Sequence, residues 1–232
     1  MTERTTRRKT SRFRGVAAEE RQAQRRAMLI EAGADVFGEH GFHAATVREI
    51  CKRAKLTERY FYESFANREA LFAAVYEQLT QNLRDEMVAA LLPAPRDVGA
   101  MARAGLTTLF ASMRDDPRLM RILFVDVFTV SDEVDRLSRR TTGAFAQLLQ
   151  TLVDSFYPAD RRGGLDTNLI AHGLVGACMN LVMYWAYGGY KEPLESVVHN
   201  VAVLFEALGA YVGGAEAPAA PAGPGRRVTR RR

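Results

Sequence analysis

Helical spacing of small and apolar residues recurs along most of this chain, and it is the feature that most narrows the possible folds. Ile30, Gly33, Ala34 and Phe37 follow the i, i+3, i+4, i+7 pattern of one helix face. Similar segments continue to about residue 211, and no run shows the two-residue alternation of a half-buried strand. The sequence therefore predicts an all-α protein of about nine helices.

Short Gly, Pro or charged segments separate the predicted helices. Gly41 should end the first helix, because glycine adopts the left-handed conformation that closes helices. Pro93 and Pro95 should break the chain after the fourth helix. The expected helices are 17–39, a short one from Thr46, another from Thr57, and then 67–92, 97–113, 117–127, 132–156, 165–187 and 193–211.

Two short helices form the most informative motif. Thr46 and Glu49 have the spacing of a capping box, in which each side chain bonds a free backbone N–H of the other residue. Cys51 falls on the apolar face of this helix, so we interpret it as a packing residue. Thr57 should cap the next helix after a tight turn at 53–56. This arrangement is a helix-turn-helix.

A helix-turn-helix binds DNA by placing its second helix in the major groove. Thr57, Arg59 and Tyr60 are predicted to face the bases. Arg59 is the strongest candidate, because a guanidinium can bind guanine through two hydrogen bonds. A solvated helix surface is the alternative interpretation. The predicted contacts to the phosphate backbone are Thr46, Arg48, Tyr62 and Arg68.

The motif and its surroundings resemble the TetR family of repressors. The resemblance lies in LIEAGADVFGEHGF at 29–42, TVREI at 46–50 and LTERYFYESFANREAL at 56–71. It implies a three-helix DNA-binding domain, a larger helical domain that binds a small effector, and a homodimer formed mainly by the last two helices. By position, Thr46 and Tyr62 are similar to the family's phosphate-contacting Thr and Tyr, and Arg68 replaces its usual Lys.

Two residues depart from the family pattern. Lys55 occupies a turn position where the family usually has Gly. If that position requires a positive φ, Lys55 costs about 1 kcal/mol, which attraction to a phosphate would offset. Lys55 is therefore a further predicted DNA contact. Arg59 stands where the family commonly has a small residue, so the operator sequence does not follow from the resemblance.

The charge distribution suggests four regions. The first 14 residues carry six Lys or Arg and one Glu, and the last 20 carry five Arg and one Glu. Basic arms of this kind often follow a phosphate backbone, although a solubilising tail is the alternative for the C-terminal one. We expect a disordered basic arm at 1–16, a DNA-binding domain at 17–66, an effector-binding and dimerisation domain at 67–212, and a disordered Arg-rich tail at 213–232.

The second domain is expected to bind a hydrophobic or amphipathic effector, as the resemblance implies. Aromatic and Met side chains on several of its helices are candidates to line an apolar cavity, with ordinary core packing as the alternative for each. The candidates are Phe110, Met113, Phe124, Phe128, Met179 and Met183.

The last two helices are the expected dimer interface. Gly173 and Gly176 permit close helix approach, and the final helix carries an apolar stripe. A two-fold dimer would present two recognition helices about one DNA turn apart, so a palindromic operator is predicted. The stripe consists of Val197, Val201, Leu204, Phe205 and Leu208.

Other classes of function find little support in the sequence. It has no Gly-rich phosphate loop, metal-ligand triad or nucleophile elbow, so we expect no enzymatic activity, cofactor or metal. Cys51 and Cys178 lack disulfide or metal spacing, which fits a cytoplasmic protein. His172 and Asn180 interrupt the apolar segment 169–187, which favours a buried helix over a membrane span. A helical ligand- or partner-binding module without sequence-specific DNA binding is the alternative function, and repressor and activator both remain open.

Overall fold

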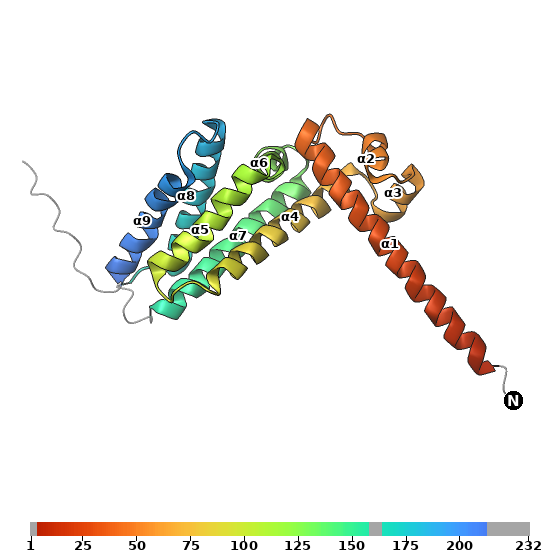
Figure 1. The fold of residues 1–232 in the computed structure, drawn as a ribbon, viewed down its shortest axis with the longest axis horizontal. Coiled ribbons are helices and arrows are strands. Elements are labelled where there is room, and N and C mark those ends of the chain that lie inside the picture. The colour runs from red at the N-terminus through yellow and green to blue at the C-terminus, as the bar shows by residue number, and fades with distance from the viewer. Residues whose placement is uncertain (1–3, 158–163, 213–232) are drawn as a thin grey trace, which may run out of the picture.

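The computed structural model describes residues 4–157 and 164–212, and these ranges form nine α-helices and one 3-10 turn (Figure 1). The Arg-rich tail predicted at 213–232 lies outside the described residues. The elements are α1 (Arg4–His40), α2 (Val47–Ala54), α3 (Glu58–Ser64), α4 (Arg68–Leu91), α5 (Val98–Asp115), α6 (Pro117–Phe124), η1 (Asp126–Phe128), α7 (Asp132–Phe156), α8 (Thr167–Tyr187) and α9 (Leu194–Val212). The all-α prediction is confirmed.

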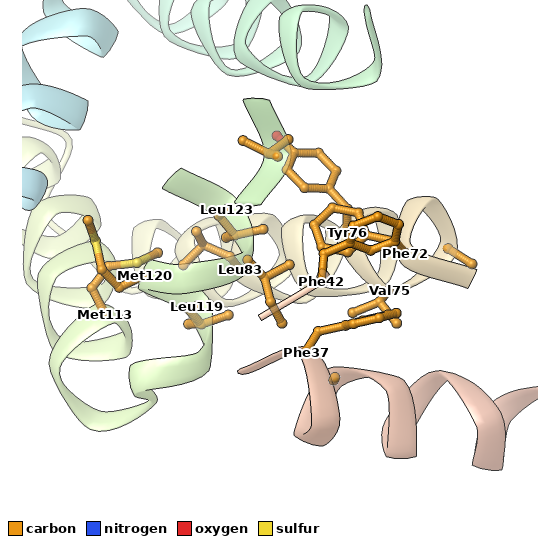
Figure 2. Close-up of a cluster of buried hydrophobic side chains, with 14 of the residues drawn as sticks. Phe37, Phe42, Phe72, Val75, Tyr76, Leu83, Met113, Leu119, Met120 and Leu123 are labelled. Atoms are coloured by element: carbon orange, nitrogen blue, oxygen red, sulfur yellow. The ribbon is translucent and has the colours of Figure 1, made fainter. Parts of the chain in front are cut away.

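The end of α1 packs with α2 and α3 into a small helical unit (Figure 1). Leu29, Ile50 and Phe61, one from each helix, are fully buried in its core. Aromatic rings join this unit to α4. The Phe72 ring centroid lies 5.2 Å from that of Phe37 and 5.5 Å from that of Phe42 (Figure 2). Helix α4 therefore belongs to the core of both parts of the molecule.

The start of α1 differs from the prediction. The helix begins at Arg4 rather than near residue 17, so the backbone of much of the expected arm is helical. Residues 4–14 contain no Gly or Pro and include several Arg and Lys residues, which favour helix even without an apolar stripe. At its other end α1 stops as predicted, because Gly41 has a φ of +81° and its N–H donates to the Phe37 carbonyl.

Helices α4 to α9 form the larger part of the molecule (Figure 1). Helix α5 packs against α4 and α9, while α7 packs against α8. Helix α6 lies between α5 and the end of α1. The short α6 is therefore, like α4, an element that contacts both parts of the chain.

The contact between α1 and α6 depends on a missing side chain. A Cβ at Gly38 would lie 2.4 Å from Cγ and 3.1 Å from Cα of Arg118. The close approach lets Arg118 donate to Asp35 at 2.5 Å. Nearby, the Phe42 N–H donates to the buried Asp126 carboxylate at 2.8 Å. These bonds fix α6 and η1 against the end of α1.

Helix α8 is less buried than the sequence suggested. Of the helices that the structure describes, it is the one long and apolar enough to cross a membrane, and 22% of its most apolar window is buried. Its inner face includes Cys178, Val182 and Trp185, whereas Leu169 and Tyr184 are each 68% exposed. The helix thus presents an apolar outer face in the single chain.

Candidate nucleic-acid interface and effector cavity

Helix α2 begins with half of the predicted capping box. The Thr46 hydroxyl accepts from the Glu49 N–H at 3.2 Å. The Glu49 carboxylate does not return the bond to Thr46, and instead pairs with His40 of α1 at 3.0 Å. Thr46 and Arg48 are exposed at the start of this helix, where backbone N–H groups favour an anion. They are placed as phosphate contacts would require.

The turn between α2 and α3 is left-handed at Lys55. This residue has φ 56° and ψ 36°, the conformation that the family's usual Gly adopts without strain. The Lys55 N–H donates to the Lys52 carbonyl at 3.2 Å, and the Leu56 N–H donates to the Cys51 carbonyl at 2.9 Å. These two bonds form a Schellman motif. The turn therefore keeps its form in spite of the lysine, whose side chain is exposed.

Helix α3 exposes its first residues. Thr57 occupies the N-cap position, but its side chain makes no capping bond, contrary to the prediction. Its hydroxyl is consequently left available to another partner. The Arg59 side chain is 84% exposed and its Nε donates to Glu63 at 3.0 Å. Such an exposed ion pair contributes little to stability and exchanges readily for another anion.

The two tyrosines of α3 have different surroundings. Tyr60 is half-buried, and the Arg25 guanidinium of α1 lies 4.5 Å from its ring centroid. Tyr62 is 58% exposed, with its ring edge-on to Phe61. Tyr62 can therefore reach an external phosphate, whereas Tyr60 is partly held by α1.

Arg68 is used within the fold. Its guanidinium lies 5.0 Å from the Phe42 ring centroid and donates to the carbonyl groups of Phe42 and Ala45. These contacts tie the start of α4 to the loop before α2. A phosphate contact by Arg68 remains a prediction that would have to share the same guanidinium.

Charged residues of α1 beside α3 were not among the predicted contacts. Arg25 lies 4.0 Å from Glu63, and the Arg26 guanidinium lies 4.7 Å from the Phe65 ring centroid. Both positions fall one turn before the apolar stripe of α1. At such positions the sequence pattern alone indicates a solvated surface.

An ion-pair network joins α1, α2 and α6. Arg53 donates two bonds to Glu39, at 2.9 and 2.7 Å, and also lies 3.4 Å from Asp35. The bond with Arg53 lowers the pKa of Glu39. Arg118 bonds both Asp35 and Asp116, and its bond with Asp116 lowers the pKa of that carboxyl. The network links the helix-turn-helix to α6 through charged residues of α1, which also packs against α6.

An apolar cavity of about 210 Å³ lies among helices α4 to α9. No Asp, Glu, Lys, Arg or His is among its lining residues; its polar groups are hydroxyls and the Cys178 thiol. This apolar lining raises the pKa of Cys178 to about 12. The aliphatic and aromatic walls include Leu83, Met87, Leu109, Leu123, Phe145, Leu148, Leu149, Leu152, Leu174 and Phe205.

Two of the six predicted cavity residues, Phe124 and Met179, line this cavity. The other four do not. Phe128 is 58% exposed on η1. Phe110 packs edge-on against Trp185 in the core, and Met113 is fully buried. Met183 packs against the core outside the lining.

Some of the lining residues that were not predicted follow a helical spacing in the sequence. Phe145, Leu148, Leu149 and Leu152 follow the i, i+3, i+4, i+7 spacing of one helix face on α7. This spacing identifies an inward face, but it does not separate a cavity wall from a packed core. Among the described residues, no group of His, Cys, Asp and Glu has a metal-binding arrangement.

Comparison with known proteins identifies the motif. Residues 29–75 match the model "Bacterial regulatory proteins, tetR family". The HTH-type transcriptional activator FasR of Mycolicibacterium smegmatis is 27% identical over 180 residues, covering 76% of this chain and 79% of its own length. The uncharacterized HTH-type transcriptional regulator YdgC of Bacillus subtilis is 27% identical over 186 residues, covering 77% and 90%.

Solved structures share the whole architecture. The transcriptional regulator FadR of Bacillus subtilis, in complex with stearoyl-CoA, superposes with a TM-score of 0.69 at 17% identity, covering 77% of this chain and 96% of that one. The fatty acid degradation regulator FadR of Bacillus halodurans gives a TM-score of 0.66 at 21% identity, covering 78% and 94%. The similarity extends across the DNA-binding unit and the larger helical domain.

Proposed function

The chain belongs to the TetR family of bacterial regulatory proteins and is a DNA-binding transcriptional regulator rather than an enzyme; from this premise we propose that it is a repressor released from a palindromic operator by an amphipathic effector. The observation that carries the proposal is the apolar cavity, whose walls include α4 and α6. The same two helices pack against the DNA-binding unit. A ligand in the cavity would therefore contact elements that hold the recognition helix.

The DNA contacts form the first part of the proposal. Arg59 would read base edges from the start of α3, aided by Thr57 and Tyr60. The backbone contacts would come from Thr46, Arg48, Lys55, Tyr62 and Arg68. The exposure of Arg59 and Tyr62 and the free hydroxyl of Thr57 support these roles. The proposed contacts of Tyr60 and Arg68 have less support, because both side chains are half-buried.

A fatty acyl chain is the proposed apolar part of the effector. The cavity offers a wall of aliphatic and aromatic side chains without a charged group, which suits a hydrocarbon chain. The similar FadR of Bacillus subtilis is described in complex with stearoyl-CoA. Phe124 and Met179 would contact the chain.

The proposed homodimer would cover the outer faces of α8 and α9. Leu169, Gly173, Gly176, Asn180 and Tyr184 share one exposed side of α8. No atom lies within 4 Å of a Cβ built at Gly173 or Gly176, so a second helix could approach closely there.

The stripe predicted on α9 contributes less to this face than expected. Val201 is buried, and Phe205 and Leu208 line the cavity, because this side of α9 packs against α5. Leu204 is the member of the stripe that points outward, at 44% exposure, and its neighbour Val203 is 45% exposed. A Tyr184→Glu variant would test the interface: analytical ultracentrifugation at micromolar concentration should find wild type dimeric and the variant monomeric. A monomeric wild type would contradict the dimer.

Release of DNA would follow from a population shift. The ligand needs only to bind more tightly to a state in which the two recognition helices no longer match successive grooves. A difference of about 3 kcal/mol suffices for more than a hundredfold loss of DNA affinity. Helix α4, which lines the cavity and packs on the DNA-binding unit, would connect the two sites.

Fluorescence anisotropy with a DNA duplex selected from a random pool tests the proposal. Dodecanoyl-CoA should weaken DNA binding by wild type, and the selected DNA should weaken dodecanoyl-CoA binding by the same factor. DNA binding that no acyl ligand alters would refute release by an acyl effector. Failure to select any sequence would favour a helical ligand-binding module without sequence-specific DNA binding. Fusion of the selected site to a reporter gene distinguishes repression from activation.

A further inference from the structure

A polar groove adjoins the apolar cavity on the side of the DNA-binding unit. The groove has a volume of about 480 Å³ and lies between α1, α4 and α7. Three residues, Thr80, Thr141 and Phe145, line both the cavity and the groove. The two spaces are therefore neighbours across a shared wall.

The shared wall is polar where the cavity is not. Burial raises the pKa of Tyr76, and its hydroxyl bonds the side chains of Ser138 and Thr141. Thr80 is 8% exposed and its hydroxyl donates to the Tyr76 carbonyl at 2.8 Å. Hydroxyls thus gather between the two spaces, where the polar end of an amphipathic molecule would leave the apolar lining.

The groove carries two guanidinium groups against one carboxylate. Arg26 comes from α1, and Arg84 and Glu77 come from α4. Within the described part of the chain, Arg84 is half-buried and no carboxylate pairs with it or with Arg26. The cavity, by contrast, has no cation that could neutralise an ionised ligand, and burying an unpaired charge there would be costly.

We propose that this groove binds the anionic head group of the effector while the acyl chain occupies the cavity. The inference rests on the proposed amphipathic effector and assigns Arg84 and Arg26 as its specificity-determining residues. A carboxylate or a phosphate fits the same guanidinium chemistry. Because Arg26 belongs to α1, the bound head group contacts the DNA-binding unit directly.

Isothermal titration calorimetry with three probes tests the assignment: dodecanoate, dodecanoyl-CoA and uncharged 1-dodecanol. Replacing Arg84 by Gln removes a charge-assisted contact and should weaken binding of the anionic probes roughly tenfold. Binding of 1-dodecanol should not change. The matched control is Arg96→Gln, at an exposed position outside both the cavity and the groove, which should leave all three affinities unchanged.

Two further variants separate the head-group site from the cavity. Leu149→Phe fills the cavity and should weaken the binding of all three probes. Arg26→Gln should weaken the anionic probes and also reduce the loss of DNA affinity that they cause, relative to its own ligand-free DNA affinity. A loss confined to dodecanoate or to dodecanoyl-CoA supports the site and identifies its partner as carboxylate or phosphate.

Other outcomes overturn the assignment. If Arg84→Gln weakens the binding of 1-dodecanol as much as that of the anionic probes, or changes the binding of none of them, the groove does not recognise a head group. If wild type binds none of the three probes while it still binds selected DNA, both this site and the acyl effector are rejected. The regulator's DNA-binding function would then stand without them.

Discussion

Lys55 is a single residue whose backbone conformation opposes stability. Its left-handed backbone is strained for any residue with a Cβ. Lys55→Gly should therefore raise the free energy of unfolding by about 1 kcal/mol. Lys52→Gly, at an exposed position inside α2, is the control and should lower it by a similar amount. Urea unfolding measures both, and a less stable Lys55→Gly would contradict the strain argument.

Cys178 makes stability depend on pH through its buried thiol. Its pKa rises from 9.0 to about 12 on burial. Above pH 9 the unfolded thiol ionises while the folded one stays neutral, so stability should fall as the pH rises from 9 toward 12. The stability of the Cys178→Ala variant should fall less steeply over the same pH range. Urea midpoints at about pH 8 and about pH 10 measure the slopes, and parallel slopes would refute the role of Cys178.

At the scale of elements, the close approach of α1 and α6 is the most sensitive contact. Gly38→Ala would force the helices apart, because the new Cβ would lie 2.4 Å from Cγ and 2.6 Å from Cβ of Arg118, and should cost about 1 to 3 kcal/mol. Gly143→Ala on α7 meets no atom within 4 Å, so it should stabilise by about 0.5 to 1 kcal/mol. Thermal unfolding compares the two. A neutral Gly38→Ala would mean that the helices adjust freely.

The sequence predicts the bounds of the helices better than it predicts which side chains line the cavity between them. The bounds of α7 agree with the predicted 132–156, because its apolar spacing is regular and its ends are well marked. The cavity was predicted poorly: Phe110 and Phe128 have the right chemistry, yet one is in the core and the other is exposed. Periodicity defines an inward face, whereas a cavity depends on how several such faces meet.

At the scale of the whole molecule, two helices connect the cavity to the DNA-binding unit. Helix α4 does so by apolar packing, with Phe72 against Phe37 and Phe42 (Figure 2). Helix α6 does so by charge, through Arg118 and Asp35. The ion pair is partly exposed, so its contribution to stability should be small. The ion pair sets the position of α1 relative to α6, which lines the cavity.

Selection of bound sequences from a random DNA pool tests whether α3 reads DNA bases. Wild type should enrich a palindromic site with half-sites about one DNA turn apart. Arg59→Ala should relax one base preference in each half-site by about 1 to 3 kcal/mol. Tyr62→Phe should weaken binding to all sequences alike. The control Arg96→Ala should bind the same site as wild type with the same affinity. No enriched site with wild type, or an unchanged site with Arg59→Ala, would contradict DNA reading by α3.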